Sequence, residues 1–526
     1  MEIRVRGYED LAVGAMRKVT TDDGSCLLVR TPDGYRAFPA ACPHYHGPLD
    51  LGLLDGHRLT CPWHQAIFDA RSGDVLEPPS FFGLPSYPIR HERETLVVTI
   101  PDADRGARSM PMIEPDYERD PRTVVIVGAG AAGGMAAEAL RQAGYGGHIV
   151  MVSAEDKPPY DRPNCSKDLL AGTMPASWMP LRSPKFYEKH NIERRHAAVV
   201  AASVSNRTVT LGDGADLTAD ALLLAPGGTP RTLDVPGASL DGIFTLRSWS
   251  DCERIVAALE EARSAAVVGA SFIGLEVAAS LRHRQIPVTV IAPEEIPFAQ
   301  QFGRVVGHAF RRLHEAHGVV FRLGASVAGF LGDRRVSAVA LADGDEVPAD
   351  VVVVGIGVQP ATDFVNGAEK QPDGALVVDE RLRLAPGVWA AGDVAAWPAA
   401  HLARRTRIEH WRLALQHGRA AALDIAGRGA PFTGVPFFWT QQYDTAFRYA
   451  GYPGEPQRCV VTGNPATGDF VTFYPIDDRP VGAFGTRDLQ VAAFAELLHH
   501  GSLPSFEELR HHPDIDLCEL LRRDRR

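Results

Sequence analysis

The sequence predicts a multidomain protein, in which a small all-β module precedes a larger α/β part with two nucleotide-binding units. Residues 1–100 contain short β-type segments such as TDDGSCLLVR and RETLVVTI, separated by turn signals and without a convincing helical pattern. From Thr123 the pattern changes to strand, glycine turn and Ala-rich helix, and this pattern recurs at 264–295. The length of 526 residues and the apolar content of 45% are sufficient for several separate cores.

Composition and charge exclude several classes of protein. The formal net charge is −11 and the basic residues are scattered, which speaks against nucleic acid or an anionic membrane as the main partner. The N-terminus MEIRVRGYED has no apolar signal region, and we find no run of about 18 apolar residues. We therefore expect a cytoplasmic protein. Seven cysteines, an odd and low count, do not make a disulfide framework.

Two short hooks within residues 42–64 each carry one cysteine and one histidine. Cys42-x-His44 is followed, after sixteen intervening residues, by Cys61-x-x-His64. Two thiolates and two imidazoles suit either tetrahedral zinc or a Rieske [2Fe–2S] cluster, in which histidines replace the cysteines on one iron. Structural zinc sites usually begin with a pair of cysteines on one knuckle, whereas each hook here offers one ligand of each kind. The spacing therefore favours the cluster over zinc.

The hooks and the downstream segment FDARSGDVLEPP resemble the Rieske ferredoxin family, without the additional loop cysteines of the respiratory Rieske proteins. The resemblance implies four cluster ligands: Cys42, His44, Cys61 and His64. Gly47 and Gly52 are expected to permit tight turns near the sulfurs. Two further histidines fall outside the ligand spacing and are expected to be solvated loop residues: His46 and His57.

A linker and a first nucleotide-binding unit follow. Residues 102–122 are rich in proline and charge without a periodic apolar face, which predicts a linker. Beyond it, a Gly-x-Gly-x-x-Gly turn formed by Gly128, Gly130 and Gly133 stands between a predicted strand and a predicted helix. In this context backbone N–H groups and the helix dipole can hold a pyrophosphate. Glu155 ends the next strand, where a carboxylate can accept hydrogen bonds from ribose hydroxyls.

The second unit has a weaker version of the same turn. Gly269, Ser271 and Gly274 form it, and the serine in the middle position reduces how closely a backbone can approach. Two turns in series nevertheless predict two dinucleotides. The segment VTVIAPEEIPFAQQ offers Glu294 and Glu295 and no lysine or arginine. Carboxylates bind a 2′-hydroxyl but repel a 2′-phosphate, so NADH is favoured over NADPH.

Two other segments resemble the two-dinucleotide flavoprotein family. They are LLLAPGGTPR at 222–231 and GVWAAGDVA at 387–395. The resemblance implies that the first unit binds FAD and that Asp393 holds the ribityl chain of FAD. It also implies that the second unit, inserted into the first, binds the nicotinamide cofactor.

The second part of the chain looks like the ferredoxin reductases of bacterial oxygenase systems and their apoptosis-inducing-factor-like relatives. The segments that carry this resemblance are PPYDRPNCSKDLL, FIGLEVAASL, RIEHWRLALQHGRAAA and PFFWTQQYD, and it covers nearly all of 123–526. It implies that Lys167 pairs with Glu276 beside the flavin ring and that Arg162 lies near FAD. It also implies two tryptophans near the isoalloxazine: Trp411 and Trp439. With a Rieske domain on the same chain, the protein most resembles the Rieske-fused, apoptosis-inducing-factor-like group.

These resemblances and the strand and helix patterns together imply a domain order. We expect an all-β Rieske [2Fe–2S] domain, an α/β reductase with Rossmann-like FAD and NAD domains, and an α+β C-terminal domain that helps to cover the flavin. The expected boundaries are 1–101 for the Rieske domain, 102–122 for the linker, 123–234 with 356–432 for the FAD domain, 235–355 for the NAD domain and 433–526 for the C-terminal domain.

One position departs from the reductase pattern. Two positions before the lysine, the reductases usually carry an aliphatic residue, whereas this chain has Cys165. A cysteine against a flavin is typical of disulfide, coenzyme A-disulfide and NADH-peroxide reductases, and Lys167 could favour its thiolate. A disulfide or peroxide reductase based on Cys165 is therefore an alternative hypothesis. The remaining cysteines are expected to be ordinary packed or surface thiols: Cys26, Cys252, Cys459 and Cys518.

The predicted function is a short electron-transfer chain. NADH delivers two electrons together and an iron–sulfur cluster accepts one at a time, so a flavin is needed between them. We expect an NADH-dependent reductase that passes electrons through FAD to its own cluster and on to an external oxygenase, haem protein or ferredoxin. A Rieske oxygenase would need a separate iron bound by two histidines and a carboxylate, and we find no such spacing. A redox-responsive signalling protein, like apoptosis-inducing factor, is a further alternative.

Overall fold

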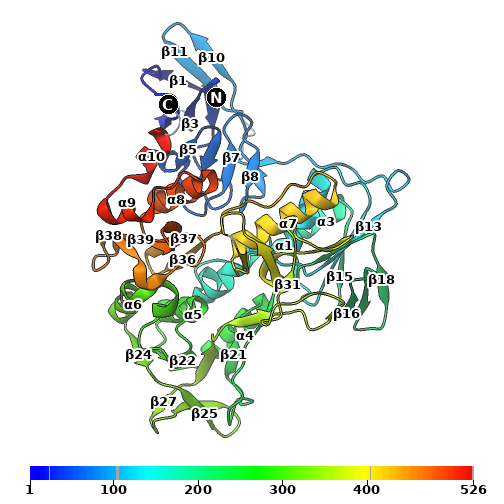
Figure 1. Cartoon of the computed structure of the whole chain (residues 1–526), viewed down its shortest axis with the longest axis vertical. Helices are drawn as coiled ribbons and strands as arrows, with labels where there is room; N and C mark the ends of the chain where they lie inside the picture. Colours follow the sequence, from blue (N-terminus) through cyan, green and yellow to red (C-terminus); the bar gives the residue numbers. More distant parts are fainter. Residues whose placement is uncertain (23, 102–105, 403, 524–526) are drawn as a thin grey trace.

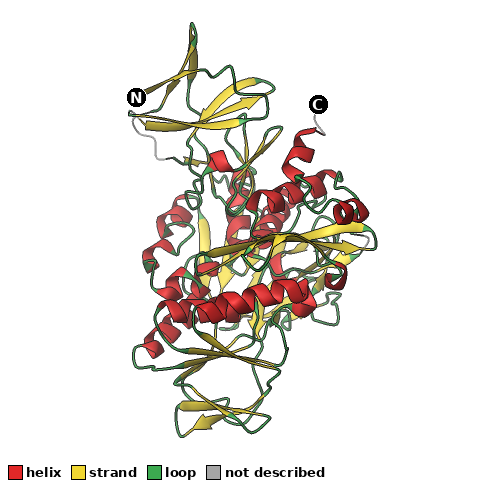
Figure 2. Ribbon diagram, turned by 90° about the vertical axis from the view of Figure 1, so that its left-hand side faces the viewer, coloured by secondary structure: helices red, strands yellow, loops and turns green. Residues whose placement is uncertain are grey.

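The computed structural model describes residues 1–22, 24–101, 106–402 and 404–523. The first hundred residues lie at one end of the molecule and the strands around residue 340 lie at the other, with the α/β sheets between them (Figure 1). Figure 2 shows helices gathered around the middle of the molecule and mainly strands at both ends. Among the described helices, none combines the length and the apolar character that crossing a membrane requires.

Residues 1–101 form small antiparallel sheets around two apolar clusters. Strand β1 alternates buried Ile3 and Val5 with exposed polar residues, which is the pattern of a sheet with one face on a core. The single helical turn of the described part is a 3₁₀ turn at Leu49–Leu51, so the prediction of an all-β module is confirmed. The strands are β1 (Glu2–Arg6), β2 (Met16–Thr21), β3 (Gly24–Thr31), β4 (Gly34–Phe38), β5 (Leu53–Asp55), β6 (Arg58–Thr60), β7 (Ile67–Asp69), β8 (Val75–Glu77), β9 (Phe82–Gly83), β10 (Ile89–Glu92) and β11 (Thr95–Thr99).

The predicted linker packs against both of its neighbours. Residues 102–105 of the predicted 102–122 lie outside the described residues, as do the last three, 524–526, of the predicted C-terminal domain. Strand β12 (Arg108–Ser109) pairs with β9 of the all-β module. The ring of Tyr117 stacks on His148 with 3.9 Å between ring centroids, and the N–H of Ile113 donates to the carbonyl of Arg141 at 3.2 Å. The described part of the linker is therefore held in place.

The first α/β sheet has six strands in the order β15-β14-β13-β19-β33-β32. Strand β13, the glycine turn, helix α1 and strand β14 form the predicted βαβ unit, with Val124 opposite Ile149 in parallel register. Helix α7 packs closely on α1, because a Cβ at Gly418 would lie 2.1 Å from the Ala132 carbonyl oxygen. The elements are β13 (Thr123–Val127), α1 (Ala131–Gln142), β14 (His148–Ser153), β15 (Ile192–His196), β19 (Ala221–Leu224), β32 (Arg383–Ala385), β33 (Val388–Ala390) and α7 (Trp411–Ile425).

Shorter elements surround this sheet and connect it to the second one. Strands β20 and β29 pair antiparallel where the chain crosses between the two sheets. The remaining elements are α2 (Asp168–Ala171), α3 (Pro184–Lys189), β16 (Val199–Ser203), β17 (Thr208–Leu211), β18 (Asp216–Thr218), β20 (Gly228–Pro230), β29 (Val358–Pro360), β30 (Val365–Asn366), β31 (Leu376–Val377), β34 (Ala395–Pro398) and β35 (Arg405–Thr406).

The second α/β sheet is parallel and has the order β21-β28-β22-β23-β24. Its βαβ unit, β22-α5-β23, is the second unit predicted from the sequence, so two nucleotide-fold units are confirmed. A three-stranded antiparallel sheet follows it. The elements are β21 (Ile243–Thr245), α4 (Trp249–Leu259), β22 (Ala265–Val268), α5 (Phe272–His283), β23 (Val288–Ala292), α6 (Ala299–Ala316), β24 (Val319–Leu323), β25 (Val327–Gly332), β26 (Val336–Leu341), β27 (Glu346–Pro348) and β28 (Val351–Val354).

The C-terminal part is a five-stranded antiparallel sheet followed by helices, as the sequence predicts. The helices lie beside the all-β module (Figure 1). The elements are β36 (Phe437–Gln442), β37 (Thr445–Gly451), β38 (Val460–Asn464), β39 (Asp469–Ile476), β40 (Arg479–Gly485), α8 (Asp488–His500), α9 (Phe506–His511) and α10 (Leu517–Arg523). The domain boundaries given above stay predictions.

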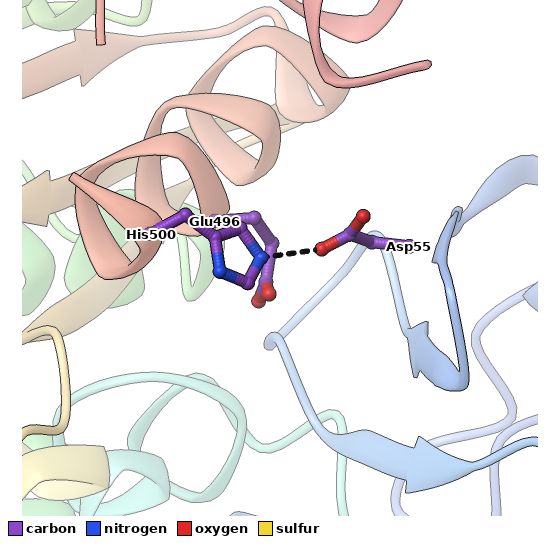
Figure 3. Close-up of side chains that lie close together, drawn as sticks. All are labelled: Asp55, Glu496 and His500. Carbon is purple, nitrogen blue, oxygen red and sulfur yellow. Dashed lines mark hydrogen bonds and ion pairs between the residues drawn. The ribbon is translucent and has the colours of Figure 1, made fainter. Parts of the chain in front are cut away.

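Ion pairs join the all-β module to α8. Arg58 forms a bidentate pair with the buried Glu496, at 2.7 and 3.2 Å. Nε2 of His500 lies 2.7 Å from Oδ2 of Asp55, the contact drawn in Figure 3. Polar atoms of Asp55, Glu496 and His500 lie within 4.8 Å of one another, a spacing that a metal ion could use. Because the Arg58 guanidinium already engages both oxygens of Glu496, we interpret the group as an interdomain contact.

Candidate functional site

The two hooks of the all-β module fold into the same turn. The N–H four residues after each cysteine donates to the cysteine carbonyl, from His46 to Cys42 at 2.8 Å and from Gln65 to Cys61 at 3.2 Å. Each cysteine N–H in turn donates to the carbonyl five residues ahead. His46 and Gln65 both have left-handed φ values, 57° and 55°. The repeated turn sets both cysteines in the same backbone geometry and leaves His46 exposed.

The four predicted cluster ligands lie together between the hooks. Nδ1 of His44 is 3.1 Å from Nδ1 of His64, and the thiols of Cys42 and Cys61 are hydrogen-bonded to each other. Burial lowers the pKa of His44 to about 3 and the pKa of His64 well below its usual value, so both imidazoles are neutral. Burial raises the pKa of Cys42, whereas the hydrogen bond with Cys42 lowers the pKa of Cys61.

This donor set fits a [2Fe–2S] cluster. Neutral imidazoles and paired thiols are the groups that become ligands on metal binding. An added Cβ at Gly47 would lie 2.9 Å from the Cys61 sulfur, and one at Gly52 would lie 2.2 Å from the Thr60 carbonyl oxygen, so close packing beside the second hook favours glycine at both positions. Cys42 and Cys61 would hold one iron, and the two histidines would hold the other.

A cavity of about 920 Å³ lies where both α/β sheets meet the C-terminal domain. Its size suits a dinucleotide site. The predicted site residues that line it are Gly128, Gly130, Glu155, Arg162, Lys167, Ser271, Glu276, Asp393, Trp411 and Trp439. The predicted residues outside its lining are Gly133, Gly269, Gly274, Glu294 and Glu295.

The first glycine turn fits the pyrophosphate of FAD. Gly128 has a φ of 102°, and its Cβ would lie 2.2 Å from the Ala225 carbonyl oxygen. The Cβ of Gly133 would lie 1.8 Å from the Gly128 oxygen. At Gly130, by contrast, φ is an ordinary −79° and the nearest described atom to a Cβ is Nη2 of Arg162 at 4.0 Å. The fold does not require glycine there, so the open cradle is explained by a ligand that approaches the backbone.

Charged side chains line the same cavity in ion pairs. Glu155 lies two residues after the end of β14, and its carboxylate accepts from Arg162 and from the Tyr160 hydroxyl, both at 2.6 Å. Asp393 follows β33, and its carboxylate accepts from Arg247 at 2.8 Å. These pairs set the orientation of both acidic side chains at the cavity wall. The roles of Glu155, Arg162 and Asp393 toward FAD stay predictions.

Lys167 and Glu276 form the predicted pair inside the protein. Nζ of Lys167 lies 2.8 Å from Oε2 of Glu276, and their side chains are 14% and 3% exposed. Glu276 also accepts from Ser166 at 2.5 Å and from Thr440 at 2.7 Å. A surface ion pair would contribute little and would not need these partners. Burial with added hydrogen bonds instead indicates a positioned group at the cavity wall.

Trp439 connects the cavity to the predicted cluster ligands. Its ring lies 4.3 Å from the ring of His64 and 6.5 Å from that of His44, measured between centroids. The same tryptophan lines the 920 Å³ cavity and a second cavity of about 610 Å³ on the other side. Lys167 also lines both cavities. One aromatic side chain therefore separates the predicted flavin site from the predicted cluster site.

The second glycine turn serves its helix. The hydroxyl of Ser271, at the start of α5, accepts from the N–H of Gly274 at 3.1 Å and donates to the Gly355 carbonyl at 2.7 Å. Glu294 and Glu295 follow β23, where Glu294 is half-buried and Glu295 is exposed. Both therefore lie at the edge of the second unit, beyond the lining of the 920 Å³ cavity. Their role in choosing the nicotinamide cofactor stays a prediction.

Cys165 is placed differently from a catalytic thiol. It is 2% exposed and packs in an apolar cluster that includes Tyr160 and Cys252. It does not belong to the lining of the 920 Å³ cavity, although Ser166 and Lys167 do. Burial raises its pKa, which disfavours the thiolate that nucleophilic or redox chemistry requires. The structure thus favours no role for Cys165 in a disulfide or peroxide reductase.

Sequence reasoning missed two arginines that hold the second hook. Arg448 of β37 donates to the Trp63 carbonyl at 3.3 Å, and Arg412 of α7 donates to the Gln65 carbonyl at 3.1 Å. These carbonyls flank His64 on both sides. Arg412 also donates to the Pro78 carbonyl at 2.8 Å. The hydrogen bonds join residues more than three hundred positions apart, so no local pattern in the sequence could have indicated them.

Three family models match the chain. They are pyridine nucleotide-disulphide oxidoreductase over residues 122–418, Rieske [2Fe-2S] domain over 2–88 and Reductase C-terminal over 437–521. The predicted succession of a Rieske domain, a two-dinucleotide reductase part and a reductase C-terminal domain is therefore confirmed.

Individual proteins are similar over long stretches. Human "Apoptosis-inducing factor 3" is 35% identical over 95% of this chain and 84% of its own length. The "Biphenyl dioxygenase system ferredoxin--NAD(+) reductase component" of Paraburkholderia xenovorans is 34% identical over 70% of this chain and 92% of its own. Among solved structures, the covalent putidaredoxin reductase–putidaredoxin complex matches with a TM-score of 0.72 and 31% identity, over 76% of this chain and 98% of that chain.

Proposed function

We propose, from the premise that this chain belongs to the pyridine nucleotide-disulphide oxidoreductase family, that electrons of NADH pass through FAD to its own Rieske cluster and on to an external acceptor. The chain is a ferredoxin-reductase-type NAD(P)H oxidoreductase with a Rieske domain, and its cofactors are FAD, NAD(H) and a [2Fe–2S] cluster. The internal path, the preference for NADH and the kind of acceptor are the proposed parts.

The observation that carries the proposal is the position of Trp439. Its ring is 4.3 Å from His64 and lines the cavity that fits FAD. A single side chain between the two sites keeps them close, and close spacing is what an internal electron path needs. The matching relatives named as reductase components of dioxygenase systems support an acceptor of the oxygenase or ferredoxin type.

The chain's own residues position the reacting groups. The FAD that this cavity would hold would supply the conversion of a two-electron hydride into single electrons, which a one-electron cluster requires. Ser166 and Thr440 hold the Glu276 carboxylate, and Glu276 holds the Lys167 ammonium at the cavity wall. Arg448 and Arg412 hold the backbone on both sides of His64. These hydrogen bonds therefore keep the second hook, with His64, against Trp439.

The proposed preference for NADH rests on the end of β23. Glu294 is half-buried there, and the segment from Pro293 to Gln301 contains no lysine or arginine to neutralise a 2′-phosphate. A carboxylate at this place in a βαβ unit can accept from ribose hydroxyls.

Removing a cluster ligand tests the internal path. In rapid-mixing experiments, His64→Ala should bleach its flavin with NADH at a near-parental rate, because the hydride step uses residues 123–526. Its NADH-dependent reduction of cytochrome c, a one-electron protein acceptor, should fall by roughly a hundredfold or more, because the cluster needs all its ligands. His57→Ala is the matched control, since this histidine of the same module lies outside the ligand set and pairs with Asp33. Unchanged cytochrome c reduction in His64→Ala would show that electrons leave directly from the flavin.

A further inference from the structure

We propose that electrons leave the molecule through the 610 Å³ cavity beside His64, and that this cavity and its rim receive an acceptor protein with a positively charged docking face. We call this cavity the exit pocket. Its lining includes Trp63, His64, Asp161, Asp168, Trp439 and Asp444. The inference rests on the proposed function, because it places the last step of the same electron path.

The exit pocket reaches the cluster site from the outside. His64 is the predicted cluster ligand that lines it, and Trp439 forms part of its wall. Cys42 and Cys61 are only 1% and 3% exposed, so the sulfur side of the cluster site is closed. A group that enters the exit pocket would therefore contact the imidazole of His64. Through this imidazole it would be close to the iron that His64 would hold.

The charges at the exit pocket are unbalanced toward negative. Its two cationic side chains are already engaged, Lys167 with Glu276 at 2.8 Å and Arg448 with Asp488 at 2.7 Å. The other acidic side chains of the lining are Asp161, Asp168 and Asp444, and the last two are exposed. An acidic rim attracts positive partners and repels negative ones over distances near the Debye length.

Asp161 provides an independent indication of a cationic ligand. It is 6% exposed and lines the exit pocket. Its Oδ2 accepts from the Tyr45 hydroxyl at 2.9 Å, whereas its buried Oδ1 has no hydrogen-bond partner among the described residues. A buried carboxylate oxygen without a donor is unfavourable, and a lysine or arginine side chain inserted into the pocket would supply one.

Exposed apolar side chains complete the surface. Trp63 is 38% exposed and lies on the hook, between Cys61 and His64. Leu489, beside Asp488 of the pocket lining, is also 38% exposed. Large apolar side chains surrounded by complementary charges are typical of protein interfaces, and tryptophan is common at their centres. The combination favours a protein acceptor over a small cation, because a small cation would not bury these apolar side chains.

A charge series of acceptors tests the exit pocket. Mammalian cytochrome c serves as the basic protein acceptor and ferricyanide as the anionic small acceptor, each reduced with saturating NADH. In the parent, kcat/KM for cytochrome c should fall steeply as ionic strength rises, whereas the rate with ferricyanide should stay level or rise. Asp444→Lys should lower kcat/KM for cytochrome c roughly tenfold at low ionic strength. It should leave flavin bleaching by NADH unchanged.

The matched control is Asp343→Lys, because Asp343 is also an exposed aspartate and lies in the β26–β27 turn, at the opposite end of the molecule (Figure 1). Asp168→Lys is a second variant on the rim of the exit pocket and should act like Asp444→Lys. Equal effects of the rim and control variants, or a weak salt dependence with cytochrome c, would overturn the exit pocket.

Cluster reduction by NADH without any acceptor, followed by electron paramagnetic resonance, separates the two proposals. If the cluster is reduced while the rim variants have no effect, only the exit pocket fails; if the cluster is not reduced, the proposed function fails and the exit pocket fails with it.

Discussion

Gly130 and Ser271 occupy the same position in two glycine turns, but the two residues are required for different reasons. The Cβ position at Gly130 is open, so glycine there is explained by a ligand. The hydroxyl of Ser271 is held by Gly274 and Gly355, so serine there serves the start of α5 and the neighbouring loop. The sequence was sufficient to find both turns. It could not show where the serine side chain points, because Gly355 lies 84 positions further along the chain.

Gly130→Ala separates ligand binding from folding. The variant should fold, because its φ of −79° suits alanine and the nearest atom to the new methyl group is 4.0 Å away. It should bind FAD roughly tenfold more weakly, a loss of about 1.4 kcal/mol, since the methyl group occupies the cradle. FAD titration of the apoprotein and its thermal unfolding measure the two effects. Gly133→Ala is the contrast, because its Cβ would lie 1.8 Å from a carbonyl oxygen and should prevent normal folding. If Gly130→Ala bound FAD with parental affinity, the pyrophosphate of FAD would not lie against Gly130.

Glu294 is the residue that we expect to discriminate between nicotinamide cofactors. Glu294→Arg should lower the ratio of kcat/KM for NADH to that for NADPH roughly tenfold, because a guanidinium attracts the 2′-phosphate that a carboxylate repels. Steady-state kinetics with both coenzymes measures the ratio. Glu295→Arg is the control at the exposed neighbouring position and should change the ratio less. If the parent enzyme used both coenzymes equally, Glu294 would not be the residue that discriminates between them.

At the scale of elements, a buried histidine of helix α6 binds the β36–β37 hairpin, beside aromatic contacts such as that of Phe310 with Phe447. His314 in the last turn of α6 is fully buried, with Nε2 2.7 Å from Gln442 and Nδ1 3.2 Å from the Tyr443 hydroxyl. The sequence predicted the domains that contain these elements, a Rossmann-like NAD domain and an α+β C-terminal domain, but not helix α6 itself. The contact between them could not be predicted, because it joins positions 128 and 129 residues apart.

The junction at His314 should weaken in acid. Burial lowers the pKa of His314 to about 4 from an ordinary 6.5. Below the ordinary value the unfolded chain takes up a proton that the folded chain does not, so folded-state stability is lost as pH falls from 6.5 toward 4. By linkage this amounts to about 2 kcal/mol between about pH 7.5 and about pH 5. His314→Gln should be less stable than the parent at the higher pH, and the gap in Tm should narrow at the lower pH. His511→Gln, at an exposed site on α9, should leave the pH dependence unchanged. A constant gap would assign the acid sensitivity to other groups.

At the scale of the whole molecule, arginines on both sides of the interface hold the Rieske domain against the reductase part. Arg412 and Arg448 hold the hook, Arg182 donates to the Phe81 carbonyl at 2.9 Å, and Arg58 pairs with Glu496. The sequence predicted each domain because ligand spacing, glycine turns and strand patterns are local features. It could not predict the interface, because arginines occur throughout the sequence and their partners lie in other domains. The proposed electron path thus depends on the interface, which is the part of the structure that the sequence predicts least.

Breaking the contact of the Rieske domain with α8 tests whether this positioning matters. Arg58→Ala leaves the carboxylate of Glu496, whose side chain is 2% exposed, buried without its partner, which should cost about 3 kcal/mol in stability. The Rieske domain should then spend a smaller fraction of the time packed against Trp439. We expect cluster reduction, followed by freeze-quench electron paramagnetic resonance, to slow several-fold while flavin bleaching by NADH stays parental.

The double variant Arg58→Met/Glu496→Leu removes both charges together, so most of the stability should return, because no buried charge is left unpaired. Arg71→Ala is the control, since its pair with Asp69 lies within the Rieske domain and the arginine side chain is 55% exposed. If Arg58→Ala unfolds cooperatively at a lower temperature and yet reduces its cluster at the parental rate, Arg412 and Arg448 alone set the distance from His64 to Trp439. A slower cluster step that returns toward parental in the double variant would instead show that the whole interface, including the contact of Arg58 with α8, controls the proposed electron path.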